Sequence, residues 1–258
     1  MRTLSFLLYI LLRFIGWDLV TKVLKVISYD LARRWLEYRV NAWGAEIFRL
    51  ARLLTGLRFE VRNDLGGPLP ESAIIVSNHQ SLLDIVAILA ACPNQKIRFV
   101  AKRDLGRWIP AVSEMLRTQR HALINRKGNF RQSMGELRAL AGRCHEGLSP
   151  VVFPEGTRSG SGKLKTFHPG AYRVLAEKTD LPVVSVAVDG GYKIRSLADV
   201  RRGLSHVVYK VSFQHLYPSP VGKAEISSVL ERTRRDVALQ LSRWRGEALR
   251  DVIEGPIG

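Results

Sequence analysis

The sequence contains a histidine and an aspartate whose spacing suits acid–base chemistry. In "SNHQSLLD", residues 77–84, His79 and Asp84 stand five positions apart between two apolar runs. Within one continuous helix five residues turn about 500°, which would leave the two side chains roughly 140° apart. We therefore expect His79 to precede a helix that carries Asp84 in its first turn. The carboxylate would then bind one ring nitrogen and leave the other free as a base.

The residues around this pair leave two interpretations open. Ser81 and Asp84 have the spacing of a capping box, so Asp84 could serve only the start of the helix. The chain has no G-x-S-x-G sequence, and Ser81, expected at the cap, is the only nearby hydroxyl. A His/Asp pair without its own nucleophile suits a reaction in which the hydroxyl of a substrate attacks directly.

A second polar stretch follows an apolar run at "VVFPEGTRSGSG", residues 151–162. An arginine on a glycine-containing turn at the end of a strand, as expected for Arg158, suits a bidentate contact with a phosphate. Glu155 could orient that arginine or a hydroxyl group of the ligand. The alternative is a surface turn with a solvated ion pair.

Together the two stretches resemble the signature blocks of the glycerolipid acyltransferases, whose type member is 1-acylglycerol-3-phosphate acyltransferase. Asn78, His79 and Asp84 meet the family's NHxxxxD block, and residues 153–159 match its FPEGTRS block without change. Between them "FVAKRDLGRWIP" is similar to the family's AKxxLxxxP stretch. The resemblance covers residues 57–215.

The chain also departs from the family pattern. In the second block, "RHALINR", Arg120 replaces the usual glycine and Asn125 the usual aspartate, while Arg126 remains. His168 stands where many relatives have lysine, and Ser185 stands at the second proline of the fourth block. We expect these differences to line the pocket for the acyl acceptor.

The resemblance implies acyl transfer from acyl-CoA or acyl carrier protein to the hydroxyl of a lysophospholipid, foremost 1-acylglycerol-3-phosphate. His79 would be the base and Asp84 its partner. It implies no metal and no cofactor besides the donor co-substrate. The residues that it assigns to the phosphate-bearing head of the acceptor are Arg126, Glu155, Gly156, Thr157 and Arg158.

The sequence is also compatible with other functions. Lyso-ornithine lipid or another lysolipid is the alternative acceptor. From other classes, the alternatives are a thioester hydrolase, in which water replaces the alcohol, and a non-catalytic basic lipid-binding protein.

From residue 57 onward, short apolar runs alternate with helical patterns, which predicts an α/β fold with a largely parallel sheet of about seven strands flanked by helices. The predicted strands are 57–61, 73–77, 97–101, 121–125, 150–154, 182–188 and 207–213. The predicted helices are 81–91, 107–117, 129–144, 170–178 and an amphipathic basic helix over 225–250, packed on the body or on a bilayer.

We divide the chain into an N-terminal helical membrane-anchoring segment, 1–56, and an acyltransferase domain, 57–258. "TLSFLLYILL" is strongly apolar, but Arg13 and Asp18 interrupt it before the roughly 18 to 20 residues of a spanning helix. No small-residue cleavage site follows it. We expect an anchor that embeds in or lies on the membrane; the alternative is a helix packed on the protein's own core.

The charge is strongly basic, with 40 Lys and Arg against 23 Asp and Glu, a net +17. Such a balance favours an anionic membrane surface, the phosphates of acyl-CoA or an acidic carrier protein, and no nucleic-acid signature accompanies it. We therefore expect membrane association at the cytoplasmic face. The basic face is expected to comprise Arg98, Lys102, Arg103, Arg107, Arg117, Arg120, Arg126, Lys127 and Arg131.

Overall fold

The computed structural model describes residues 2–107, 109–125, 128, 130–194, 199 and 204–255, and within them seven strands form one sheet. Their order is β1-β7-β6-β2-β5-β3-β4. The strands are β1 (Arg58–Asn63), β2 (Ile74–Ser77), β3 (Lys96–Lys102), β4 (Ala122–Ile124), β5 (Leu148–Val152), β6 (Val183–Asp189) and β7 (Val208–Tyr217). Each of the seven predicted strands is present.

The sheet is largely parallel, which confirms the predicted fold class. β4, β3, β5, β2 and β6 run in one direction. β7 is antiparallel to β6, and β1 is parallel to β7. Because of this reversal, β7 begins at the edge of the sheet where the five parallel strands end.

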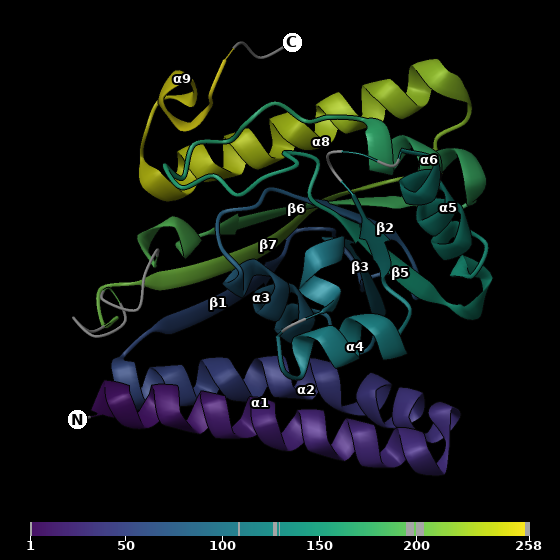
Figure 1. Cartoon of the computed structure of the whole chain (residues 1–258). Coiled ribbons are helices and arrows are strands. Elements are labelled where there is room, and N and C mark those ends of the chain that lie inside the picture. Colours follow the sequence, from purple (N-terminus) through teal and green to yellow (C-terminus); the bar gives the residue numbers. More distant parts are fainter. Residues whose placement is uncertain are drawn as a thin grey trace.

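Helices cover both faces of the sheet (Figure 1). One side holds α3 and α4 and, beyond them, the long antiparallel pair α1 and α2; the other side holds α5, α6 and α8. The described helices are α1 (Arg2–Ile27), α2 (Tyr29–Thr55), α3 (Leu83–Ala91), α4 (Val112–Thr118), α5 (Phe130–Ala141), α6 (Gly170–Lys178), α8 (Gly222–Arg245) and α9 (Leu249–Val252).

Two helices differ from the prediction for local reasons. The predicted helix 107–117 begins only at Val112, after Pro110 and after Ala111, whose φ of 60° is left-handed and incompatible with a continuous helix. The predicted helix 225–250 ends at Arg245, because Gly246 adopts the left-handed C-cap conformation. The apolar face of α8 packs on the sheet, burying side chains that include Ile226 and Leu241.

The N-terminal helix α1 carries an apolar face that the protein does not cover. From Leu4 to Ile27 it is long and apolar enough, by length and composition, to cross a membrane, although we expected Arg13 and Asp18 to interrupt it. Both charges are paired: Arg13 with Glu46 of α2, and Asp18 with Lys22. The exposed apolar side chains of this helix are Leu4, Leu8, Leu11, Leu12, Ile15, Leu19, Val20, Val23, Val26 and Ile27.

The second helix α2 is integrated with the sheet domain. Its buried side chains, among them Leu36, Val40 and Ile47, belong to the same core cluster as α3 and the adjoining face of the sheet. The segment 1–56 therefore shares a hydrophobic core with the rest of the chain.

Arg98, which we expected on the basic surface, lies inside the protein. It is 2% exposed and forms an ion pair with Glu37 of α2. Beside it, the ring Nδ1 of His121 accepts a hydrogen bond of 2.8 Å from the backbone N–H of Phe99. Burial, reinforced by the charges of Arg98 and Arg143, holds the pKa of His121 well below its usual range.

This depressed pKa predicts a loss of stability in acid. The unfolded chain takes up a proton at His121 near pH 6.5, which the folded chain does not bind, so the folded state is destabilised as the pH falls below that value. His121→Asn removes this titration. Its free energy of unfolding should fall less steeply than that of the wild type between pH 7.5 and 5.5, by up to about 1.4 kcal/mol per pH unit.

The measurement is urea unfolding in mild detergent at several pH values, followed by tryptophan fluorescence. His145→Asn is the matched control, because it makes the same change at an exposed position. Parallel curves for the wild type and His121→Asn would contradict the prediction.

Candidate active site

The site lies where β2 and β5, neighbours in the sheet, reach their carboxyl ends, the usual place for ligands in such folds. The loop after β2 begins with Asn78, which is buried and bonds to both backbone groups of Val188 in β6. Its side-chain N–H₂ donates to the carbonyl at 2.9 Å, and its oxygen accepts from the N–H at 2.8 Å. Asn78 thus continues the sheet's hydrogen bonding by one residue and fixes the start of the loop.

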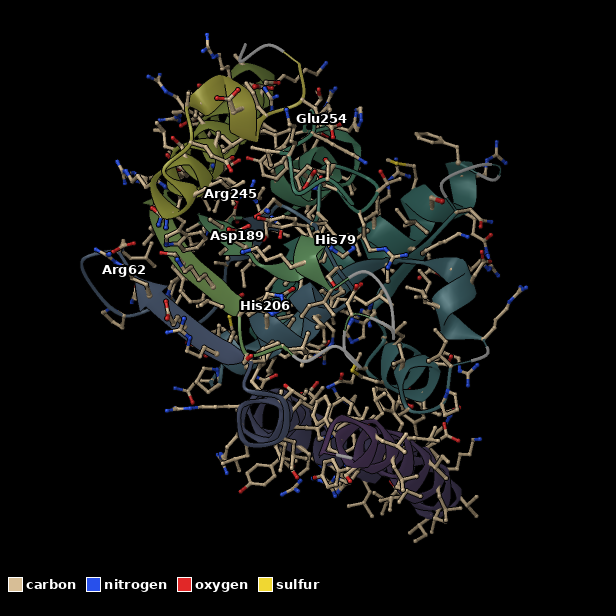
Figure 2. All side chains as sticks on the ribbon, turned by 90° about the vertical axis from the view of Figure 1, so that its left-hand side faces the viewer. Arg62, His79, Asp189, His206, Arg245 and Glu254 are labelled. Atoms are coloured by element: carbon tan, nitrogen blue, oxygen red, sulfur yellow. The ribbon has the colours of Figure 1, made fainter. Side chains whose placement is uncertain are left out.

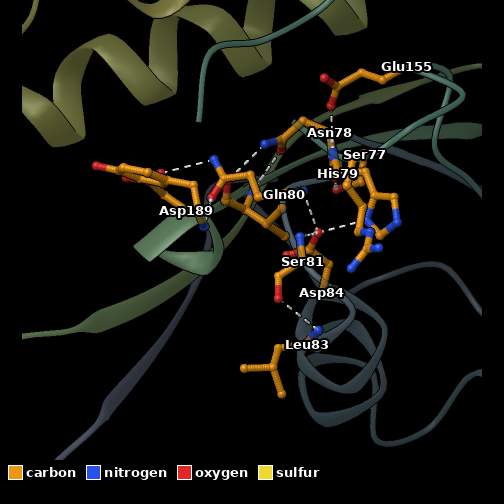
Figure 3. A network of polar contacts seen from close by, with 12 residues as sticks. Ser77, Asn78, His79, Gln80, Ser81, Leu83, Asp84, Glu155 and Asp189 are labelled. Atoms are coloured by element: carbon orange, nitrogen blue, oxygen red, sulfur yellow. Dashed lines mark hydrogen bonds and ion pairs between the residues drawn. The ribbon is translucent and has the colours of Figure 1, made fainter. Parts of the chain in front are cut away.

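His79 and Asp84 are in direct contact (Figure 3). His79 Nδ1 lies 2.8 Å from Asp84 Oδ2, and the same oxygen accepts the backbone N–H groups of Gln80 at 2.6 Å and Ser81 at 2.8 Å. Because the carboxylate only accepts, Nδ1 must carry the proton of a neutral ring, which leaves Nε2 as the basic nitrogen. The loop is therefore wound around the carboxylate.

The helix start differs slightly from the predicted capping box. α3 begins at Leu83, with Leu82 rather than Ser81 at the cap position. The Asp84 half of the motif is present, since its carboxylate accepts the Ser81 N–H, and the Ser81 hydroxyl accepts instead from the N–H of Leu83 at 3.3 Å. Asp84 therefore serves the helix start and the histidine together.

Glu155 supports the loop from the opposite side. It is 4% exposed, and its Oε1 accepts the backbone N–H of His79 at 2.6 Å while Oε2 accepts that of Lys165 at 3.0 Å. Burial, opposed by these two hydrogen bonds, raises the pKa of Glu155 to about 7. We expected this carboxylate to contact Arg158 or an acceptor hydroxyl, but both of its oxygens bind backbone groups and it does not line the cavity beside His79.

A cavity of about 560 Å³ brings His79 and Arg158 together. The imidazole stacks on Phe153, with ring centroids 4.2 Å apart. Thr157 and Arg158 are exposed at this cavity, and Lys102 from the end of β3 lines it as well. Arg158 makes no side-chain ion pair or hydrogen bond with another residue that the structure describes.

Two predicted site residues are not in this group. Arg126 lies outside the described residues. Gly156, with a left-handed φ of 70°, lines a separate cavity of about 140 Å³ together with His168.

The residues that depart from the family pattern, Arg120, Asn125, His168 and Ser185, do not line the cavity beside His79. Arg120 has a φ of 55°, in the left-handed region that favours glycine, and its guanidinium lies over the ring of Tyr29. Ser185 is buried and donates to Asp236 of α8 at 2.8 Å. Ser185 and His168 therefore do not contribute to the cavity beside His79, and His168 lines the smaller cavity with Gly156.

Sequence reasoning missed a network that fixes Gln80. Its side-chain N–H₂ donates to Asp189 Oδ1 at 3.1 Å, and Asp189 in turn pairs with Arg245 at the end of α8 at 2.5 Å. Figure 2 shows Asp189 and Arg245 beside each other and near His79. Arg245 also donates to the carbonyl of Gly162 at 3.0 Å. Arg245 is the last residue of this amphipathic helix, and nothing in the sequence marks it as the partner of Asp189.

The arrangement can remove a proton from a ligand bound in the cavity. A neutral imidazole held by a buried carboxylate is a general base, and a free guanidinium on the same wall can bind an anionic group. The cavity is also partly apolar, with Leu82, Ile85 and Phe99 in its lining. It therefore suits a ligand that has an anionic head, a hydroxyl and an apolar part.

Known proteins resemble this chain in sequence. The family model described as Acyltransferase matches residues 58–189. The chain is 34% identical over 132 residues to human 1-acyl-sn-glycerol-3-phosphate acyltransferase beta, covering 51% of this chain and 46% of the relative. It is 30% identical over 164 residues to the lyso-ornithine lipid O-acyltransferase of Pseudomonas aeruginosa, covering 60% of each. The chain thus spans about half the length of the human relative.

The fold has a counterpart among solved structures. The crystal structure of the 1-acyl-sn-glycerophosphate (LPA) acyltransferase of Thermotoga maritima aligns with a TM-score of 0.70 at 22% identity. The alignment covers 94% of this chain and 96% of that one. At this level of identity the likeness establishes the shared fold.

The position of Glu155 makes a testable prediction about the site's stability. Glu155→Ala would leave two N–H groups without their acceptor: the buried one of His79, at roughly 1 to 3 kcal/mol, and the part-buried one of Lys165, which water can partly solvate. We expect the free energy of unfolding to fall by about 1 to 3 kcal/mol in urea unfolding. Glu177→Ala is the control, since it removes only an exposed ion pair with Arg173, which water screens. Equal losses in the two variants would show that Glu155 does not hold the loop.

Proposed function

This chain belongs to the acyltransferase family, and from that premise we propose that it transfers a fatty acyl group from a thioester to the hydroxyl of a lysophospholipid. The match to the family confirms the resemblance drawn from the sequence motifs. The acceptor that we propose is 1-acylglycerol-3-phosphate, and the donor is acyl-CoA or acyl carrier protein. Lyso-ornithine lipid is the alternative acceptor, because a relative of that name is also similar to this chain.

One observation carries the proposal: His79, held by Asp84, lines the same cavity as Arg158. A base and a cation on one wall match an acceptor that has a hydroxyl near a phosphate. A non-catalytic lipid-binding protein has no need of an imidazole whose orientation is fixed by a buried carboxylate.

In the proposed reaction, Nε2 of His79 takes the proton of the acceptor hydroxyl as its oxygen attacks the thioester carbonyl. The tetrahedral intermediate collapses by breaking the carbon–sulfur bond, and the imidazolium returns the proton to the departing thiolate. The products are an ester and a free thiol. Asp84 keeps the ring in the required tautomer and stabilises the imidazolium between the two steps.

The acceptor's phosphate would bind Arg158, with Thr157 and Lys102 beside it on the cavity wall. Arg126 remains a proposed phosphate ligand on the family resemblance alone. For Glu155 we now propose a positioning role, because both of its oxygens bind backbone N–H groups. Gly156, at the separate cavity, would contribute the left-handed turn that this loop requires.

A second cavity has room for an acyl chain. It measures about 380 Å³, is almost entirely apolar, and lies between the N-terminal helices and α3. It shares Ser81, Leu82, Arg158 and Ile194 with the cavity beside His79. Other lining residues are Phe6, Ile10, Phe14, Phe48 and Val86. A lipid whose head binds Arg158 could therefore place an alkyl chain in this cavity.

We propose that the protein is attached to the cytoplasmic face of the cell membrane through α1. The support is the uncovered apolar face of this helix and the basic balance of the chain, which favours anionic lipids. A lysolipid substrate resides in the same membrane, so attachment brings the site to its acceptor.

The catalytic proposal predicts the effect of removing the base. In membranes that contain the protein, labelled acyl-CoA or acyl carrier protein is supplied with a panel of lysolipids. His79→Ala should lower formation of the diacyl lipid by roughly 10² to 10⁴-fold, the usual contribution of a positioned base. His145→Ala, at an exposed position outside the cavity, is the matched control and should retain full activity.

The products distinguish the alternatives. A hydrolase would release fatty acid in place of a diacyl lipid, and a non-catalytic binding protein would give neither product above background. Equal diacyl formation by the wild type and His79→Ala would refute the assignment of His79. The lysolipid that gives the largest kcat/KM identifies the acceptor.

The membrane proposal predicts where the protein fractionates. Leu8, Leu12 and Leu19 are exposed on α1, and burying one leucine contributes about 1.5 to 3 kcal/mol. Replacing all three by Gln should move the protein from the membrane pellet to the soluble fraction after cell lysis. Val221→Gln is the control, since Val221 is also an exposed apolar residue but stands at the start of α8, on the other side of the sheet from α1. A triple variant that still sediments with membranes would show that α1 is not the anchor.

A further inference from the structure

The second oxygen of Asp84 has a partner that neither the sequence motifs nor the family comparison assigns. The hydroxyl of Tyr209, in β7, donates a hydrogen bond to Asp84 Oδ1. The other oxygen, Oδ2, already accepts from the His79 ring and from the N–H groups of Gln80 and Ser81. The carboxylate therefore has a donor on each oxygen.

Tyr209 reaches Asp84 because of the direction of its strand. β7 runs antiparallel to β6, and Lys210 of β7 pairs with Asp189 at the end of β6. Tyr209 thus lies at the edge of the sheet where the histidine loop begins, 125 positions away from Asp84 in the sequence.

The contact is closely enclosed. Tyr209 is fully buried, and its ring packs against Phe48 of α2 at 5.4 Å between centroids. A Cβ atom at Gly191 would lie 2.7 Å from the Tyr209 hydroxyl and 3.0 Å from Asp84 Oδ1, so a side chain at this position would displace the pair. The absence of a side chain at residue 191 keeps the tyrosine against the carboxylate.

We propose that Tyr209 is a positioning residue for the acyl transfer proposed above, acting through Asp84 to hold the His79 ring in its basic tautomer and orientation. A carboxylate bound only through Oδ2 can rotate about its Cβ–Cγ bond and exchange its oxygens. The phenol fixes Oδ1 and so keeps Oδ2 directed at Nδ1 of His79. Burial and the neighbouring Asp84 charge raise the pKa of the Tyr209 phenol well above its usual value, so the hydroxyl remains a donor.

The inference rests on the proposed function for its catalytic consequence. The hydrogen bond between Tyr209 and Asp84 can be tested without turnover. Tyr209→Phe removes the hydroxyl and keeps the ring. Tyr172→Phe is a matched control, because Tyr172 is equally buried and its hydroxyl has no hydrogen-bond partner among the described residues. Both variants are made in the full chain in detergent and checked for folding by circular dichroism and thermal unfolding.

Two measurements follow. In the acyl-transfer assay, Tyr209→Phe should lower kcat about tenfold or more and leave KM for the lysolipid within about twofold, as for the loss of groups that orient a reacting residue. In the Asp84→Ala background, the same change should cause no further loss of kcat, because the carboxylate through which Tyr209 acts on His79 is already absent. Proton NMR should show that the His79 Nδ1–H resonance, assigned with His79→Ala, moves in Tyr209→Phe and stays in place in Tyr172→Phe.

The outcomes separate this inference from the proposed function. If the wild type transfers no acyl group to any lysolipid, the proposed function fails, and the Nδ1–H resonance still tests the contact. A folded Tyr209→Phe variant with wild-type kcat, an unmoved resonance, or an equal further loss in the Asp84→Ala background would overturn the inference. Should Tyr209→Phe not fold, 3-fluorotyrosine at position 209 keeps the shape and strengthens the donor; an unmoved resonance there would overturn it too.

Discussion

The site depends on one constraint: the Asp84 carboxylate is fully buried, so its charge must be stabilised by donors from the protein itself. Four donors meet it, from the His79 ring, two loop N–H groups and the Tyr209 hydroxyl. A buried anion with fewer donors would favour the protonated acid, which could no longer orient the imidazole. The shape of the histidine loop follows from this requirement, because two consecutive N–H groups must point at one oxygen.

The fold supplies these donors from segments that are distant in sequence. The loop after β2 and the first turn of α3 bring His79 and Asp84 together locally. Tyr209 comes from β7, which runs antiparallel to β6, whereas β6 is parallel to β2. Glu155 holds the loop from the end of β5. Because each of these groups is itself buried and bonded, the imidazole has few ways to move except at the edge that faces the cavity.

The sequence was sufficient to predict the parts of this arrangement that depend on residues close together along the chain. Alternating apolar runs predicted all seven strands, and the five-residue spacing predicted that His79 precedes the helix of Asp84, as it does. It was insufficient where a partner lies far along the chain. Arg98 looks like a surface charge until Glu37 of α2 is placed against it. Glu155 resembles a ligand-binding acid next to Arg158, yet the two N–H groups that occupy it come from other segments and carry no signature in the sequence.

The direction of β7 is the clearest example of this limit. A run such as "VVYKVSF" is equally compatible with either strand direction, because apolar alternation does not encode orientation. In a wholly parallel sheet, the beginning of this strand would lie at the edge opposite the site, and Tyr209 would be one more core aromatic. Antiparallel pairing with β6 moves that end of the strand to the site, and the same side chain then completes the coordination of Asp84. The environment of His79 therefore depends on the direction of β7, which the sequence around residue 79 does not indicate.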